Sequence, residues 1–546
     1  MTPIKTIKKD LISLVLIFGV FFGFNLGVRP LSTPDEGRYA EIPREMVASD
    51  DYVTPRLNGV KYFEKPPLMY WLGSLSLKVF GPKEWGLRLW PALFSLLSVL
   101  LVYLTGTWIY NRSVGWLSSL TLGTSLLFYS HSQILILDGA VSFFITLSLF
   151  SFILASLFPK KQTLALGMFY TAMAMATLSK GLIGAVIPGT IILIWTSVTK
   201  QWKTLGLAFK PWGIFLYLAI MLPWHILVSL KNPEFPYFYF IQEHLLRYTT
   251  TMHGRKQFFG FFILIAMLGW FPWIGFFGPV FKQYFKNAKL LLSSLKTDFF
   301  WLISAAFILA FYSVSKSQLI PYVLPVFPPL SLVLGKSLST IKVPQFKAGF
   351  YVFLGISFIL AALIPLVIVQ RQIDYLPILP HIIIAIAILL LSPPLVFLLF
   401  LKKGPLKALY GIMMASFLLC VTVTQVWPTF ENRSIKTLSD HLKSFLTSND
   451  QVICYRRYYQ DLPFYLNRIV NVVGWKGELE FGMDQEDTSA WMMQESDFRK
   501  LWQSHKKVYM VTRKESYDSL KSEGILELFP LAETKEDILV VNKEPL

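Results

Sequence analysis

The sequence predicts an α-helical membrane protein of many spans with an α/β domain at its C-terminal end. Three observations predict this class: 54% of the 546 residues are hydrophobic, 15% are charged, and long apolar runs recur from residue 11 to residue 428. A typical soluble domain has about 25% charged residues. The composition therefore excludes an ordinary soluble enzyme.

Thirteen apolar runs have about the length, roughly 17 to 25 residues, that a membrane-spanning helix needs. They lie near residues 11–29, 89–110, 114–131, 139–157, 163–179, 182–198, 212–230, 258–281, 299–314, 319–340, 348–370, 380–401 and 408–428. The first run lacks a small-residue cleavage site, so we expect a retained helix rather than a removed signal peptide. An odd number of spans predicts that the two termini lie on opposite sides of the membrane.

Lysine and arginine predict which side is cytoplasmic. Under this count one side receives the basic clusters at residues 5–9, 160–161, 200–210, 282–296, 342–347 and 402–407. Such clusters mark the cytoplasmic side. They also account for the net charge of +18 without a nucleic-acid partner. The opposite side receives the polar segments 31–70 and 231–257 and the C-terminal tail, so we expect the chemistry to face outward.

The composition changes near Pro428, which predicts a transmembrane domain over residues 1–430 and an α/β domain over 431–546. In the second domain we expect helices near 433–446, 461–467, 496–504 and 515–522, and strands near 451–457, 469–474, 507–512, 526–530 and 537–541. It has no glycine-rich phosphate loop, so we expect a structural or gating cap. Cys420 and Cys454 are too few for a disulfide framework or a cysteine metal site.

The segment 31–70 is the main candidate for chemistry, because a simple connection between two membrane helices can be far shorter. Asp35 and Glu36 open a predicted helix at 36–48 that we expect to lie in the membrane interface. Asp35 either caps this helix or orients or deprotonates an acceptor group. Further along, Lys65 precedes two prolines; it either extends to the headgroups or contacts a phosphate.

Other charged residues lie at the ends of the later apolar runs. Asp138 precedes an apolar helix, and is either its N-cap or a functional acid at the edge of the membrane. Lys180 closes a short outer loop and is either a headgroup-directed lysine or a phosphate ligand. In the segment 231–257, aromatic residues fit an interfacial belt, but His244 needs another explanation. His244 together with Glu64 could hold a divalent ion, although two ligands do not identify one.

Six motifs of this chain resemble a known family in order and spacing: TPDEGRYAEIPREM, YFEKPPLMYW, LDGA, LSKG, FYFIQEHLLRY and SKSQLIPYVLPVFPPL. The family is the aminoarabinose transferases of lipid A, within the protein-mannosyltransferase-like integral membrane glycosyltransferases of GT-C type. The resemblance covers nearly the whole chain. It implies thirteen transmembrane helices, a periplasmic C-terminal α/β domain, and transfer of a sugar from a polyprenyl-phosphate carrier on the periplasmic face of the bacterial inner membrane.

The residues that match the family's motifs would carry this reaction. The resemblance implies catalytic roles for Asp35 and Asp138, and we expect Glu36 to be the third catalytic residue, which shapes the same site. It implies contacts with the donor phosphate for Tyr62, Lys65, Lys180 and Tyr322, and a metal-holding pair in Glu64 and His244. The expected chemistry requires no cofactor. The pair of Glu64 and His244 could hold a divalent metal ion.

The expected function is therefore an inverting glycosyltransferase that uses an undecaprenyl-phosphate sugar donor in the membrane lipid. Lipid A phosphate is the preferred acceptor, and a protein or another envelope glycan is the alternative. The carrier phosphate is the leaving group, so cations and hydrogen-bond donors should lie where its charge develops. A secondary transporter or lipid flippase is the alternative from another class. It would place ionisable residues at mid-membrane and show two related halves, and neither feature is evident.

Overall fold

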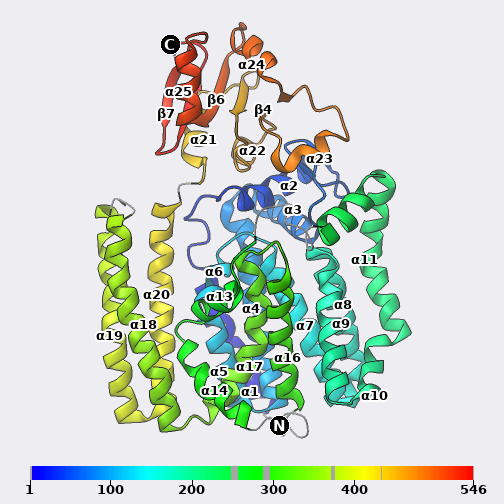
Figure 1. The fold of residues 1–546 in the computed structure, drawn as a ribbon, viewed down its shortest axis with the longest axis vertical. Coiled ribbons are helices and arrows are strands. Elements are labelled where there is room, and N and C mark those ends of the chain that lie inside the picture. Colours follow the sequence, from blue (N-terminus) through cyan, green and yellow to red (C-terminus); the bar gives the residue numbers. More distant parts are fainter. Residues whose placement is uncertain (1–2, 247–255, 287–295, 371–374, 432, 545–546) are drawn as a thin grey trace. The chain divides into compact units, whose positions relative to one another are not determined.

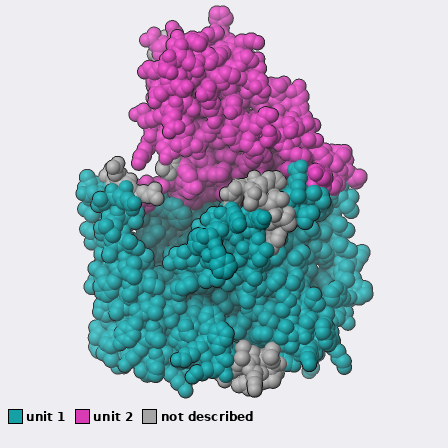
Figure 2. All heavy atoms as spheres, viewed as in Figure 1, with its two compact units in different colours: residues 1–26, 88–226, 239–427 teal, residues 27–87, 227–238, 428–546 magenta. Residues whose placement is uncertain are grey.

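The computed structural model describes residues 3–246, 256–286, 296–370, 375–431 and 433–544. The chain forms two compact units (Figure 2). Unit 1 contains residues 1–26, 88–226 and 239–427, and unit 2 contains residues 27–87, 227–238 and 428–546. Unit 2 thus joins the C-terminal tail with two segments from earlier in the chain. The predicted domain boundary at 430/431 stays a prediction.

Unit 1 is a bundle of helices (Figure 1). The main helices that lie in it, wholly or for most of their length, are α1 (Ile4–Gly23), α4 (Glu84–Ile109), α5 (Arg112–Gly123), α6 (Leu126–Ser132), α7 (Asp138–Leu157), α8 (Gln162–Lys180), α9 (Ile183–Val198), α10 (Trp202–Leu205), α11 (Pro211–Lys231), the π-helix η3 (Tyr237–Leu246), α13 (Phe261–Gly269), α14 (Ile274–Lys286), α16 (Lys296–Val314), the 3₁₀ helix η4 (Ile320–Val326), α17 (Phe327–Ser339), α18 (Val343–Gln370), α19 (Leu379–Lys403) and α20 (Pro405–Phe430). The chain is a multi-pass membrane protein.

The structure divides some of the predicted spans. In its described residues, eight helices are long and apolar enough to cross a membrane, or nine if the pair α13 and α14, bent by 114°, is one span. The run predicted at 114–131 is divided into α5 and α6. At this break the Leu126 N–H donates to the Phe271 carbonyl (3.0 Å), and the Trp273 indole donates to the Thr124 hydroxyl (3.1 Å). Tertiary hydrogen bonds thus replace helical ones, which the apolar pattern does not reveal.

The hairpin of α7 and α8 positions one part of the candidate site. The two helices are consecutive and pack against each other along their length. In such a hairpin the first residue of one helix lies at the same end as the last residue of the other. Asp138 begins α7 and Lys180 ends α8, so this topology brings an acid and a base together at one end of the bundle.

Unit 2 combines the first polar segment with the C-terminal α/β domain. The polar segment contains α2 (Asp35–Ser49), an antiparallel hairpin of β1 (Arg56–Leu57) and β2 (Val60–Lys61), and α3 (Leu68–Phe80). The α/β domain contains α21 (Lys436–Lys443), β3 (Gln451–Tyr455), α22 (Leu462–Leu466), β4 (Asn471–Val473), α23 (Glu480–Met483), β5 (Met492–Met493), α24 (Glu495–Trp502), β6 (Val508–Arg513), α25 (Lys514–Glu523), β7 (Phe529–Glu533) and β8 (Asp537–Val541).

The α/β domain has one six-stranded sheet in the order β5-β4-β3-β6-β8-β7. The strands β5, β4, β3 and β6 pair in parallel, and β8 and β7 extend the sheet antiparallel. A buried apolar cluster from the sheet, α24 and α25 forms its core. The predicted α/β class is confirmed. The strand β5 was not predicted, because two methionines carry no strand signal.

Backbone contacts are among those that hold the polar segment against the α/β domain within unit 2. The Asn58 side chain in the β1–β2 turn exchanges two hydrogen bonds with the Val470 backbone, at 2.9 and 3.0 Å. In α2, Gly37 lies directly against Asp461: a Cβ atom at Gly37 would be 2.6 Å from the Asp461 nitrogen. Only glycine allows this approach, so α2 is placed on the α/β domain through its backbone.

Candidate active site

Asp35 does not cap α2. The helix begins at Asp35 itself, Pro34 is its N-cap residue, and the described contacts of Pro34 include no side-chain capping bond. Glu36 bonds back to the segment before the helix: its carboxylate accepts the Ser32 N–H at 2.9 Å, and its own N–H donates to the Ser32 carbonyl at 3.0 Å. The Asp35 side chain is 63% exposed. The capping interpretation of Asp35 is therefore wrong, and its carboxylate stays accessible for chemistry.

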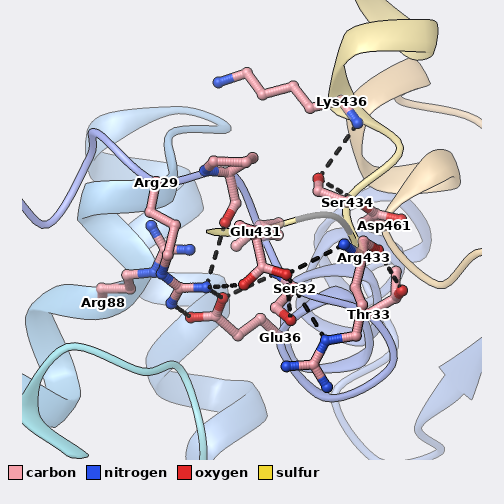
Figure 3. Close-up of polar contacts among 12 residues, drawn as sticks. Arg29, Ser32, Thr33, Glu36, Arg88, Glu431, Arg433, Ser434, Lys436 and Asp461 are labelled. Atoms are coloured by element: carbon pink, nitrogen blue, oxygen red, sulfur yellow. Dashed lines mark hydrogen bonds and ion pairs between the residues drawn. The ribbon is translucent and has the colours of Figure 1, made fainter. Parts of the chain in front are cut away.

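Glu36 is part of a buried ionic cluster (Figure 3). The Arg29 guanidinium lies 2.7 Å from a Glu36 oxygen and 3.1 Å from a Glu431 oxygen. Ser32 donates its hydroxyl to the other Glu431 oxygen at 3.1 Å. The cluster joins the chain before α2 to the chain after α20. These contacts give Glu36 a structural task, and its predicted share in catalysis stays a prediction.

Arg38 is at the centre of the polar contacts around Asp35. Its Nη1 donates to an Asp35 oxygen at 3.1 Å, and its Nη2 forms an ion pair with Glu478 of the α/β domain. The guanidinium carbon lies 5.7 Å from the centre of the Tyr62 ring. The sequence-based prediction missed both Arg38 and Glu478. Arg38 stands within the TPDEGRYAEIPREM motif and could have been considered, whereas no local pattern marks Glu478.

Two hydrogen-bond donors in this cluster are buried and have no acceptor among the described residues: the Arg38 Nε and the Tyr62 hydroxyl. Burial raises the pKa of the Tyr62 hydroxyl well above its usual range, so the phenol stays protonated. A charged guanidinium and a neutral hydroxyl both suit an anionic ligand such as a phosphate. The cluster thus contains the kinds of donor that bind anions.

Lys65 and Glu64 extend the cluster toward α3. The Lys65 ammonium donates to the Glu64 carbonyl at 2.7 Å and lies 3.8 Å from a Glu64 carboxylate oxygen. Their side chains are 17% and 16% exposed, so both are largely buried. Pro66 and Pro67 follow directly and restrict the backbone before α3.

Unit 1 carries a second polar cluster. Lys180 forms an ion pair with Asp138, and the two side chains are 10% and 13% exposed. The Lys180 ammonium also lies 4.0 Å from the centre of the Tyr322 ring. Asp138 is the first residue of α7, and Leu137 is its N-cap residue, so the capping interpretation of Asp138 is wrong. Three predicted site residues that are far apart in the sequence therefore meet.

His244 adjoins this cluster through the turn after Lys180. Gly181 has a φ of +85°, and a Cβ atom there would lie 1.9 Å from the His244 Nε2. The Leu182 N–H donates to the His244 Nε2 at 3.3 Å, so Nδ1 carries the proton that bonds the Tyr239 carbonyl at 2.6 Å.

These contacts do not fit a metal ligand, because both ring nitrogens of His244 already have hydrogen-bond partners. In the part of the chain that the structure describes, no three His, Cys, Asp or Glu side chains are grouped to hold a metal ion. The metal pair of Glu64 and His244 stays a prediction. Arg247, three residues after His244 in the sequence, lies outside the described residues.

Two family models match parts of the chain. Residues 9–239 match the model described as dolichyl-phosphate-mannose-protein mannosyltransferase. Residues 438–542 match the aminoarabinose transferase C-terminal domain. The two matches correspond to the first half of the helical region and to the α/β domain, so Arg38 lies in one match and Glu478 in the other.

Curated relatives share one name, undecaprenyl phosphate-alpha-4-amino-4-deoxy-L-arabinose arabinosyl transferase. The protein from Aeromonas salmonicida is 31% identical over 328 residues, which are 60% of this chain and 59% of that relative. A second protein from Proteus mirabilis is 29% identical over 383 residues, 68% of each chain. The chain thus spans somewhat more than half the length of the first of these relatives.

Solved structures match over nearly the full length. The crystal structure of ArnT from Cupriavidus metallidurans bound to undecaprenyl phosphate has a TM-score of 0.86 and 27% identity, and the match covers 98% of both chains. Its apo state has a TM-score of 0.84 and 28% identity, with the same coverage. The similarity therefore includes the α/β domain as well as the helices.

Proposed function

We propose that this aminoarabinose-transferase-like membrane protein of GT-C type transfers a sugar from an undecaprenyl-phosphate donor to a cell-envelope acceptor, with the phosphate of lipid A as the first acceptor to test. The full-length similarity to a structure bound to undecaprenyl phosphate supports the donor. The name shared by the curated relatives supports a 4-amino-4-deoxy-L-arabinose sugar.

The observation that carries the proposal is the cluster of Asp138, Lys180 and Tyr322. The three residues come from α7, α8 and η4, and they meet with a cation between a carboxylate and an aromatic ring. A cation at the edge of a membrane span is expensive without a function or a partner. Lys180 is well suited to stabilise the negative charge of a leaving phosphate.

The reaction is a single displacement at the anomeric carbon of the sugar. The acceptor oxygen forms a new bond to this carbon while the bond from the carbon to the carrier phosphate oxygen breaks. The electron pair of that bond leaves with the phosphate, so the carrier is released as undecaprenyl phosphate. Positive groups aimed at the developing charge lower the barrier. We assign this role to Lys65, Lys180, Tyr62 and Tyr322.

Asp35 acts on the acceptor. Its exposed carboxylate is held by Arg38, so it can orient the acceptor group or take its proton during attack. An acceptor phosphate that is already ionised needs only the orientation. Asp138 and Glu36 shape the same reaction in this proposal: Asp138 through the position of the Lys180 ammonium, and Glu36 through the start of α2.

The proposed location is the bacterial inner membrane, with the N-terminus in the cytoplasm and the reaction on the periplasmic face. The asymmetric distribution of lysine and arginine supports this orientation. A reporter fused after Leu546 should be active only in the periplasm. Activity only in the cytoplasm would contradict the orientation.

Transfer of radiolabelled sugar tests the proposal. Purified protein is mixed with a polyprenyl-phosphate sugar donor and with lipid A, a protein or another envelope glycan as acceptor. We expect label to appear in lipid A and the carrier to be released. Transfer to another envelope acceptor would correct the acceptor alone, whereas transbilayer movement of the lipid without transfer would refute the enzyme.

A further inference from the structure

We propose that Glu478 of the C-terminal α/β domain is a positioning residue for the transfer reaction, which holds the Arg38 guanidinium in place beside Asp35. This inference rests on the proposed function and extends it, because it gives the α/β domain a direct part in the reaction. The domain was predicted from the sequence to be a structural or gating cap.

Both oxygens of the Glu478 carboxylate have a donor. Gln460 donates its side-chain N–H to Oε1 at 2.8 Å, and the Arg38 Nη2 bonds Oε2. The side chains of Arg38 and Glu478 are 12% and 15% exposed. A charged pair with this degree of burial is stronger and more directional than a surface ion pair. Glu478 therefore fixes one end of the guanidinium.

The remaining donors of Arg38 are left for the site. Nη1 bonds the exposed carboxylate of Asp35, while Nε is buried and has no acceptor among the described residues. The same guanidinium lies over the Tyr62 ring, and the Tyr62 hydroxyl is also buried and has no acceptor in the described part of the chain. Glu478 thus holds a guanidinium that also donates to the acceptor-side acid.

Attachment of the α/β domain does not explain this ion pair. The same two parts of unit 2 are joined by Asn58 at Val470 and by the close contact of Gly37. A further pair, Arg56 with Glu486 at 2.8 Å, links the polar segment to the α/β domain without touching Arg38. That pair provides a matched control, since it also joins an arginine of the segment 31–70 to a glutamate of the domain.

The test compares Glu478→Gln with Glu486→Gln in the full-length protein. Glutamine at 478 keeps the size of the side chain, but its neutral amide can place N–H groups against the Arg38 guanidinium. Loss of a hydrogen bond to a charged group corresponds to roughly 10- to 100-fold in an equilibrium or rate constant. We expect Glu478→Gln to lower kcat at least about tenfold, with little change in the KM for the acceptor.

Binding of undecaprenyl phosphate alone is the second readout, and it does not depend on transfer. We expect Glu478→Gln to weaken this binding and Glu478→Asp, which keeps the charge, to restore part of it. Glu486→Gln should match the parent in both assays. Equal effects of the two glutamine variants, or a loss in Glu478→Gln that affects donor and acceptor KM alike, would overturn the inference.

These outcomes separate the inference from the proposed function. If the parent binds undecaprenyl phosphate but transfers no sugar, the proposed function fails, and the binding comparison still tests Glu478. If the parent transfers sugar and Glu478→Gln behaves as Glu486→Gln does, the inference alone fails. A parent that does not bind undecaprenyl phosphate overturns both.

Discussion

Asp35→Asn separates a structural role of Asp35 from a chemical one. The substitution removes the charge and basicity of the carboxylate and hardly changes its shape. In the folded protein the Asp35 side chain is 63% exposed, and its described partner is Arg38 at 3.1 Å, three residues further along α2. The structure therefore predicts a small effect on folding.

The two effects differ widely in size. An exposed ion pair within one helix turn contributes about 0.2–0.5 kcal/mol, and an acid in the first helical turn adds about 0.3–1 kcal/mol through the helix dipole. Loss of a positioned acid or base in catalysis lowers the rate by about 10²–10⁴, which corresponds to roughly 3–5 kcal/mol. The expected catalytic loss is several times larger than the expected loss of stability.

The assay measures sugar transfer by purified Asp35→Asn protein, with thermal unfolding and binding of undecaprenyl phosphate as controls. We expect normal folding and binding, and transfer at least about a hundredfold slower than in the parent. Transfer at more than about one third of the parental rate would refute a role for Asp35 in the reaction. Asp35 would then contribute only to the stability of the first turn of α2.

Three further predictions concern Lys180, Gly37 and Asp461. Lys180→Gln keeps a hydrogen-bond donor for Asp138 but removes the positive charge. It should slow sugar transfer by roughly 10²-fold or more in the radiolabel assay. Unchanged kinetics would show that Lys180 has no role in the reaction. Gly37→Ala places a Cβ atom 2.6 Å from the Asp461 nitrogen and should destabilise the protein by about 1–3 kcal/mol, seen in thermal unfolding as a lower Tm. Burial raises the pKa of the Asp461 carboxyl to about 7, so the folded protein binds a proton that the unfolded chain releases near pH ~4. The free energy of unfolding should therefore fall as the pH rises from about 4 to about 7, and Asp461→Asn should flatten this dependence in melts recorded across that range.

Local pattern predicted most of the fold. The apolar runs marked the helical regions, and alternating elements marked the α/β domain. The pattern failed where tertiary contacts decide, as at the break between α5 and α6, where Leu126 bonds a carbonyl from a distant segment. A hydrophobic run reports affinity for the membrane, and it carries no information about where a neighbouring segment interrupts the helix.

The candidate site shows the same limit. Asp138 and Lys180 are the first and last residues of consecutive helices, so their meeting could have been predicted from the hairpin. The pair of Arg38 with Glu478 joins residues that are 440 positions apart, and neither residue shows this in its local sequence. Asp35 and Asp138 were each weighed as helix caps, and the structure assigns the N-cap positions to Pro34 and Leu137.

The most direct test of the account follows both products of one reaction. Its central claim is a single displacement in which the carrier leaves as a monophosphate. Mass spectrometry of the lipid products and NMR of the transferred sugar would measure the carrier released per sugar transferred and the anomeric configuration. We predict one undecaprenyl phosphate released for each sugar transferred, with inversion at the anomeric carbon. Retention of configuration, or release of a pyrophosphate carrier, would contradict the account.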